Sequence, residues 1–191
     1  SEDLEMADII RLMVGRELTN QFPPKTNTPG EVYLEVENIT GMYNQLRDVT
    51  FNARKGEVLG LAGLDSSGRT ETLESIFGIR TRKSGKITLE GKQCLNRNAN
   101  ESIKNGFALL TEERRATGIF GVLNIRENTV ISSLKRHKRF GLWLSDKSQR
   151  EDTQRYIDAM RTKTPSQETK IRSLSGGNQQ KVIIGRWLLT E

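Results

Sequence analysis

Two glycine-containing loops carry the residue types that bind phosphate. The first is Gly63-Leu64-Asp65-Ser66-Ser67-Gly68-Arg69-Thr70, followed by Glu71, and it fits the P-loop pattern G-x-x-x-x-G-K-[ST] with arginine in place of lysine. In such a loop backbone N–H groups surround the phosphates, a cation adds charge and a hydroxyl binds magnesium. We therefore expect residues 63–71 to bind a nucleotide phosphate, with Thr70 as a magnesium ligand.

Three side chains of this first loop predict binding rather than efficient hydrolysis. Arg69 keeps the positive charge, but its planar guanidinium cannot mimic a compact ammonium. Ser66 stands where a glycine is common, and a positive φ at a non-glycine residue costs about 1 kcal/mol. Asp65 adds a negative charge beside the expected phosphate unless its side chain points away.

The second loop is Leu174-Ser175-Gly176-Gly177-Asn178-Gln179, and it runs directly into an apolar helical pattern. Unpaired N–H groups and the positive end of the helix dipole meet at such a helix start, which favours a bound anion. Ser175 is expected either to cap the helix or to bond a phosphate oxygen itself. The alternative is an ordinary capped helix behind a glycine-rich turn.

The surrounding pattern predicts the elements that position these loops. Alternating residues predict strands at 32–36 and 49–53, and the continuous apolar runs 57–62 and 107–110 predict buried parallel strands. A short strand is expected at 86–89 and a short helix at 100–105. After the first loop, Leu73, Ile76 and Phe77 form a helical stripe that Gly78 ends. Strand, glycine loop and helix in this order predict an α/β fold of the P-loop NTPase type.

The rest of the chain is expected to divide into four regions. Residues 1–30 are interpreted as the tail helix (3–14) of a preceding domain and a proline-rich linker (21–30), or as a helix that docks on this domain. Residues 31–117 form the P-loop core with a β part, 118–173 a helical subdomain, and 174–191 the second loop with its helix. Capping boxes are predicted at Asn124–Glu127 and at Ser148–Glu151.

Composition fits a polar globular protein, with 34% hydrophobic and 28% charged residues. The single cysteine, Cys94, excludes an internal disulfide. The net charge is +6, and its densest cluster, residues 135–139, is interpreted as a solvated basic helix end rather than a nucleic-acid site. His137 within it has no partner at metal-ligand spacing and is expected at the surface.

Together, the two loops resemble the nucleotide-binding domains of ABC transporters, in which LSGGQ-type loops are the family signature. Residues 174–179 are therefore called the signature loop below. Four segments look like the second half of bacterial sugar-import proteins that fuse two such domains. They are the Gly68-Arg69-Thr70 variant and the runs 105–115 (NGFALLTEERR), 163–165 (KTP) and 173–189 (SLSGGNQQKVIIGRWLL). The resemblance extends over nearly the whole chain and implies an ABC fold truncated on its C-terminal side.

This resemblance implies ATP and Mg²⁺ as ligands of the P-loop. It places Glu112 at the Q-loop position, as a second magnesium ligand beside Thr70, although a surface ion pair with Arg114 or Arg115 is an equal alternative. It places Tyr43 near the adenine ring. In the signature loop (Leu174, Ser175, Gly176, Gly177, Asn178 and Gln179), the serine and glycines would contact the γ-phosphate of ATP held by the opposite domain.

The resemblance also implies partners and a location. The partners would be a first nucleotide-binding half in the same polypeptide, membrane-spanning permease subunits and, indirectly, a periplasmic sugar-binding protein, with no nucleic acid. The location would be the cytoplasmic face of the bacterial inner membrane. The imported sugar would be galactose or methyl galactoside, with ribose or another monosaccharide as alternatives.

The family's catalytic Asp-Glu pair and switch histidine do not occur between the signature loop and Glu191. We therefore expect no catalytic residue within this chain and little ATP hydrolysis by it alone. One alternative is an ABC-type ATPase that acts on DNA or the ribosome, although residues 118–173 show no coiled coil, zinc site or basic arm. A P-loop kinase or GTPase would leave the signature loop unexplained.

Overall fold

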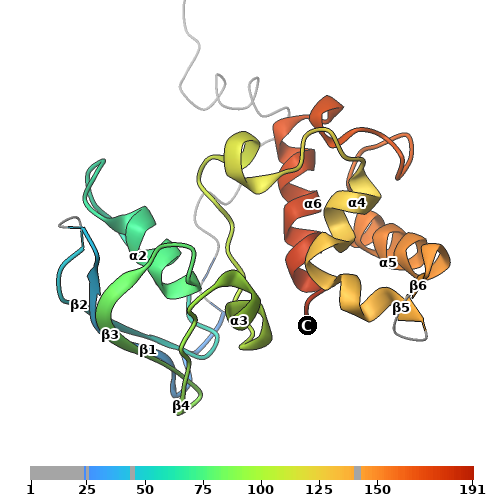
Figure 1. Cartoon of the computed structure of the whole chain (residues 1–191). Coiled ribbons are helices and arrows are strands. Elements are labelled where there is room, and N and C mark those ends of the chain that lie inside the picture. Colours follow the sequence, from blue (N-terminus) through green and yellow to red (C-terminus); the bar gives the residue numbers. More distant parts are fainter. Residues whose placement is uncertain (1–23, 25, 44–45, 140–142) are drawn as a thin grey trace, which may run out of the picture.

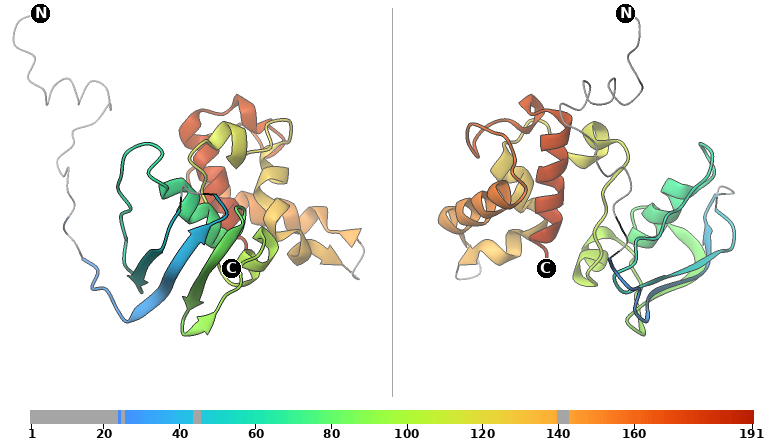
Figure 2. Two further views of the ribbon diagram at one scale, coloured as in Figure 1. Left: turned by 60° about the vertical axis from the view of Figure 1, so that its left-hand side comes forward. Right: turned by 180° about the vertical axis from the view of Figure 1, so that it is seen from behind.

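A computed structural model describes residue 24 and residues 26–43, 46–139 and 143–191. The expected helix at 3–14 and part of the expected linker lie outside these residues. Figures 1 and 2 show a twisted sheet carrying helix α2 on one side of the molecule and a group of helices around α6 on the other. The chain crosses from the first part to the second through residues 107–124.

The sheet has four antiparallel strands in the order β2-β1-β3-β4. They are β1 (Val32–Gly41), β2 (Val49–Arg54), β3 (Arg82–Leu89) and β4 (Lys92–Gln93). β1 is central, because Val36 pairs with Phe51 of β2 on one side and with Ile87 of β3 on the other. The expected strands at 32–36, 49–53 and 86–89 are confirmed.

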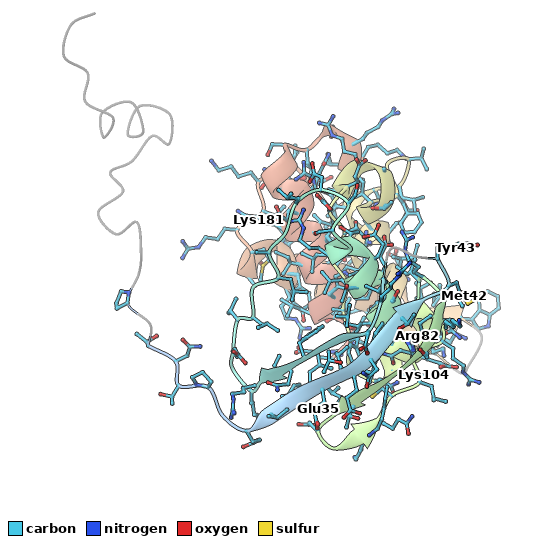
Figure 3. The ribbon with its side chains drawn as sticks, turned by 90° about the vertical axis from the view of Figure 1, so that its left-hand side faces the viewer. Glu35, Met42, Tyr43, Arg82, Lys104 and Lys181 are labelled. Atoms are coloured by element: carbon cyan, nitrogen blue, oxygen red, sulfur yellow. The ribbon has the colours of Figure 1, made fainter. Side chains whose placement is uncertain are left out.

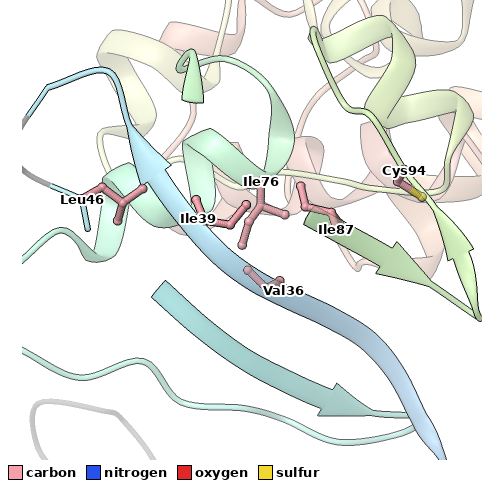
Figure 4. Packing of buried hydrophobic residues seen from close by; sticks show 6 residues of the cluster. All are labelled: Val36, Ile39, Leu46, Ile76, Ile87 and Cys94. Atoms are coloured by element: carbon pink, nitrogen blue, oxygen red, sulfur yellow. The ribbon is translucent and has the colours of Figure 1, made fainter. Parts of the chain in front are cut away.

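One apolar core lies between this sheet and α2 (Arg69–Phe77). Its members come from β1, from the residues after β1, from α2, from β3 and from the residues after β4, and Figure 4 shows them meeting across the face of the sheet. They are Val36, Ile39, Leu46, Ile76, Ile87 and Cys94. This packing fixes the axis of α2, and therefore the direction in which the P-loop faces.

The two expected parallel strands at 57–62 and 107–110 are not formed. Within the described part of the chain every hydrogen-bonded strand pair is antiparallel, and neither segment joins a ladder. Both segments instead line an apolar cavity of about 250 Å³ beside α2. A parallel strand needs hydrogen-bonded neighbours and cover on both faces, whereas Val58 is 93% exposed here. The apolar runs are extended, but they lack strand partners.

Helix α2 begins and ends at glycines, as the pattern predicts. Gly68 precedes it with φ 92° and Gly78 follows it with φ 78°, and the N–H of Gly78 binds back to the last turn. The buried face differs from the predicted stripe, because Thr72 and Ser75 are buried whereas Leu73 is 44% exposed. The helix therefore packs through one side of its C-terminal half.

The second part of the molecule is mainly helical, as expected for residues 118–173. After α3 (Ala99–Lys104) and the π-helical turn η1 (Arg114–Gly118) come α4 (Ile125–Val130), η2 (Ile131–His137), α5 (Asp146–Ala159), η3 (Ile171–Ser173) and α6 (Gly176–Leu188). A small hairpin of β5 (Lys138–Arg139) and β6 (Trp143–Leu144) interrupts the helices. Ile125, Ile171, Leu174 and Val182 form the core of this part.

One of the two expected capping boxes is present. Asn124 accepts from the N–H of Glu127, and the Glu127 carboxylate accepts from the N–H of Asn124. The expected box at Ser148 is wrong, because α5 already begins after Ser145. The hydroxyl of Ser145 accepts the N–H of Ser148, which places Ser148 inside the helix.

His137 is buried, and the expectation of a surface histidine is therefore wrong. Its Nδ1 lies 3.0 Å from the hydroxyl of Ser148, and its Nε2 has no partner in the described part of the chain. Burial lowers the pKa of His137, an effect that Asp152 at 4.0 Å partly opposes. The ring contacts Ser148 and Asp152 of α5, and a local sequence pattern does not reveal that α5 packs against it.

A buried arginine joins the helical part to the segment that leads out of the sheet. Arg186 of α6 donates to the backbone and side-chain oxygens of Asn128 and to the carbonyl of Gly118. The Asn128 side chain in turn accepts a hydrogen bond from the N–H of Phe120 and donates one to its carbonyl. Desolvation lowers the pKa of Arg186 to about 10. The network fixes η1 relative to α4 and α6.

Candidate functional site

The P-loop contains a tight turn at its centre. The N–H of Ser67 donates to the carbonyl of Leu64 at 3.1 Å, and Ser66 has φ 65°. A positive φ at the third of four turn residues defines a type II turn, which ordinarily takes glycine there. The strain predicted at Ser66 is thus confirmed.

The first glycine of the P-loop lies close to the side chain of Ser67. A Cβ at Gly63 would clash with the Ser67 hydroxyl oxygen, so a larger residue fits only if that side chain turns away. The N-terminus of α2 has no side-chain cap at Gly68. Its first N–H groups therefore remain available to an anion, as the P-loop interpretation requires.

Thr70 and Glu112 meet beside this helix start. The Thr70 hydroxyl donates to the Glu112 carboxylate at 2.8 Å, although the two residues are 42 positions apart. A hydroxyl that donates its hydrogen keeps its lone pairs for a cation, and the carboxylate is a hard oxygen ligand. Within the described residues Glu112 makes no ion pair with Arg114 or Arg115, so the alternative interpretation of Glu112 is not supported.

A cavity of about 340 Å³ opens beside this pair. Its lining includes Arg69, Thr70, Glu112 and Glu113, with Leu61 and Leu109 on the apolar side. Arg69 lies 3.5 Å from Asp65, whose side chain is fully exposed. An exposed pair of this kind is weak, so the guanidinium can turn toward a phosphate, but the nearby carboxylate reduces the net positive charge.

The residues present fit a magnesium–nucleotide ligand. A phosphate needs free backbone N–H groups, which the uncapped start of α2 provides. Its cation needs oxygen ligands, which the Thr70–Glu112 pair beside that helix start provides. Bound Mg²⁺ would neutralise phosphate charge there. No cluster of three or more His, Cys, Asp or Glu side chains suited to a metal occurs among the residues described.

The signature loop leads into a helix whose N-terminus is also free of caps. Ser175 occupies the N-cap position of α6 but makes no capping hydrogen bond, and the first turn contains no acidic residue. The Ser175 hydroxyl oxygen instead accepts from the Asn178 side-chain amide at 3.0 Å. Because this oxygen is the acceptor, the Ser175 proton remains free to donate to a further group. Of the two roles expected for Ser175, capping of the helix is not formed here.

The remaining signature residues divide into an exposed and a buried set. Ser175 and Gly177 are exposed, whereas Leu174 and Gln179 are buried. The Gln179 amide donates to the carbonyls of Ile171 and Leu174. Leu174 and Gln179 are therefore buried residues that hold the loop in place, whereas Ser175 and Gly177 are the exposed ones.

Arg114 lies against the signature loop, a contact that sequence reasoning missed. A Cβ at Gly176 would lie 2.6 Å from its Nη2 and 3.2 Å from its Cζ. The residue was considered only as an ion-pair partner of Glu112. No local pattern signals this contact, because it joins η1 to the start of α6 across the fold.

Tyr43 follows β1 and is 77% exposed. Figure 3 shows it beside Met42. The ring is accessible to a ligand such as adenine, and no described hydrogen bond holds it.

Comparisons with known proteins agree with this fold. The family described as ABC transporter matches residues 46–191. The chain is 58% identical over 191 residues to the galactose/methyl galactoside import ATP-binding protein MglA of Vibrio vulnificus, covering 98% of this chain and 38% of that protein. It is 54% identical over 189 residues to the protein of the same name from Escherichia coli, covering 98% and 37%.

Solved structures match the fold at low sequence identity. A nucleotide-free ATP-binding cassette from an ABC transporter superposes with a TM-score of 0.67 and 22% identity, over 84% of this chain and 66% of that chain. A cassette dimer in a post-hydrolysis state, bound to ADP and Pi, gives 0.65 and 20% identity, over 82% and 69%. With the family match over most of its length, the chain belongs to the ABC transporter family and has the fold of its ATP-binding cassettes.

Proposed function

We propose that this chain is part of the ATP-binding subunit of an importer for galactose or methyl galactoside. The observation that carries the proposal is the pair of uncapped helix starts, at Gly68 and Ser175, on a chain 54–58% identical to proteins named for that import. The chain spans about 38% of the length of these relatives, so the transport activity is that of a longer assembly. Relatives named for import favour a transporter over an ATPase that acts on DNA or the ribosome.

Within that assembly we assign the chain to the second nucleotide-binding half, with the division into regions 1–30, 31–117, 118–173 and 174–191 given above. The Gly68-Arg69-Thr70 variant supports this assignment. Mg-ATP binds at the P-loop, with Thr70 and Glu112 as magnesium ligands and Tyr43 against adenine. The strained Ser66 and the Asp65–Arg69 pair favour binding over hydrolysis at this site.

The signature loop then serves the ATP held by the first half of the same polypeptide. The free Ser175 proton and the exposed Gly177 face outward to meet it. Permease subunits, and indirectly a sugar-binding protein, are the partners in the membrane, and the chain lies peripherally at its cytoplasmic face. No described helix is long and apolar enough to cross a bilayer.

Replacing Gly177 with aspartate in the complete protein tests this function. A Cβ at Gly177 would meet no atom within 4 Å, so we expect the fold to tolerate the change while the carboxylate repels phosphate. We expect loss of ATP turnover and of galactose uptake in vesicles, with an unchanged circular dichroism spectrum. Normal uptake by Gly177→Asp would show that the signature loop has no role in trans.

The P-loop is tested separately by calorimetric titration of Mg-ATP, with Arg69→Ala as the variant. Saturable binding that the variant weakens about tenfold or more supports a functional P-loop. Equal binding by both proteins would place the nucleotide elsewhere.

A further inference from the structure

The start of α6 combines two positive features that are unfavourable without a ligand. The helix N-terminus carries a partial positive charge from its free N–H groups, and no acidic residue in its first turn compensates it. The guanidinium of Arg114 lies directly against Gly176, the first residue of that helix. Two like charges in contact raise the free energy of the site until an anion joins them.

Nothing in the described part of the chain neutralises this guanidinium. Arg114 makes no ion pair and no side-chain hydrogen bond there, and its Nε is buried without a partner. The contrast with Arg186 is clear, because Arg186 uses its guanidinium to bind the oxygens of Asn128 and Gly118. Arg114 is held in position with its hydrogen-bonding capacity unused.

The missing Cβ of Gly176 is what allows this contact. A Cβ there would lie within 3.4 Å of Cζ and of both terminal nitrogens of Arg114. The guanidinium therefore lies on the glycine that directly follows Ser175, whose hydroxyl proton is free. A planar fork of donors, a hydroxyl donor and helix N–H groups form a set that matches the oxygens of a phosphate.

We propose that Arg114 is a phosphate-binding residue of the signature site. The inference rests on the proposed function, in which that phosphate is the γ-phosphate of ATP bound to the first half. Glu112, two residues before Arg114, accepts a hydrogen bond from Thr70, so residues 112–114 contact both the P-loop and the signature loop.

The neighbouring Arg115 provides a matched control. It has the same charge and is exposed, and it makes no described contact with the signature loop. Methionine at either position keeps most of the side-chain volume and removes the charge. Lysine at position 114 keeps the charge but loses the planar fork.

The test titrates the ¹⁵N-glycine-labelled chain with inorganic phosphate and follows the amide signals of Gly176 and Gly177. Loss of a charged hydrogen bond predicts an apparent Kd about tenfold to a hundredfold weaker in Arg114→Met. Arg114→Lys should lie between, and Arg115→Met should match the unaltered chain. Unaltered binding in Arg114→Met, equal weakening in Arg115→Met, or no response of these amides in the unaltered chain would each overturn the proposal.

A second measurement separates this inference from the proposed function. In the complete importer, Arg114→Met should raise the KM for ATP or lower kcat at least tenfold, with Arg115→Met unaffected. If Gly177→Asp abolishes uptake while Arg114→Met and Arg114→Lys leave ATP turnover unchanged, the function stands and the role of Arg114 is wrong. If Gly177→Asp leaves uptake intact, the trans function is wrong, and the phosphate titration still decides whether Arg114 binds the anion.

Discussion

Replacing Gly177 with alanine is expected to stabilise the fold and to slow ATP turnover at once. A Cβ at this position meets no atom within 4 Å, and the residue has an ordinary helical position in the first turn of α6. The substitution therefore only reduces the backbone freedom of the unfolded chain. That effect raises the free energy of unfolding by about 0.5–1 kcal/mol.

The adjacent Gly176 is the matched comparison, because it is also a glycine in the first turn of α6 but lies against Arg114. An alanine Cβ there would lie 2.6 Å from Nη2 of Arg114 and would displace the guanidinium. The entropic gain is then offset by the lost packing of that side chain. We expect Gly176→Ala to stabilise less than Gly177→Ala by at least about 0.5 kcal/mol.

Urea denaturation followed by circular dichroism measures both free energies, and ATP turnover is measured in the complete importer. Both variants should turn over ATP more slowly, because each adds a methyl group that reduces the space for a phosphate at the start of α6. Equal stabilisation by the two alanines would refute the contact between Arg114 and Gly176. Destabilisation by Gly177→Ala would refute the open surroundings assigned to that residue.

Three other substitutions test the described geometry. Ser66→Gly should raise the free energy of unfolding by about 1 kcal/mol, because it removes a side chain from a φ of 65°; a loss of stability in urea would contradict the turn. Asn128→Ala should lower the free energy of unfolding by about 3 kcal/mol, because Arg186 and Phe120 lose hydrogen-bond partners. A loss below about 1 kcal/mol would show that these hydrogen bonds do not stabilise the fold. Burial lowers the pKa of His137 below its ordinary 6.5, so the unfolded chain binds the proton more readily and the free energy of unfolding falls as the pH drops below 6.5. His137→Gln should reduce this fall, measured by urea denaturation at pH 7.5 and at pH 5.5. An equal fall in the variant would refute the role of His137.

Much of the site was predictable because it depends on short-range geometry. The P-loop spacing determines the turn, and with it the strained Ser66, since four consecutive residues set the dihedral angles. The limits of α2 follow from Gly68 and Gly78, and the capping box follows from Asn124 and Glu127. The pattern of the signature loop likewise predicts the start of α6.

The fold class was only partly readable from apolar runs. Residues 57–62 and 107–110 have the composition of buried strands, yet a strand requires a hydrogen-bonded partner that composition does not reveal. Leu73 was expected to be buried and is exposed, because the packing direction of α2 depends on where the sheet lies. His137 is expected at the surface, yet it is buried and contacts Ser148 and Asp152 of α5.

The sequence by itself determined the two glycine-containing loops and the helix starts that follow them, because each depends on residues a few positions apart. The tertiary structure alone decided what surrounds those loops. It brought Glu112 to Thr70, 42 positions away, and Arg114 to Gly176, 62 positions away. It also turned the Gln179 side chain inward, onto the carbonyls of Ile171 and Leu174. Such contacts follow from the way whole elements pack together, and a local sequence pattern does not encode that packing.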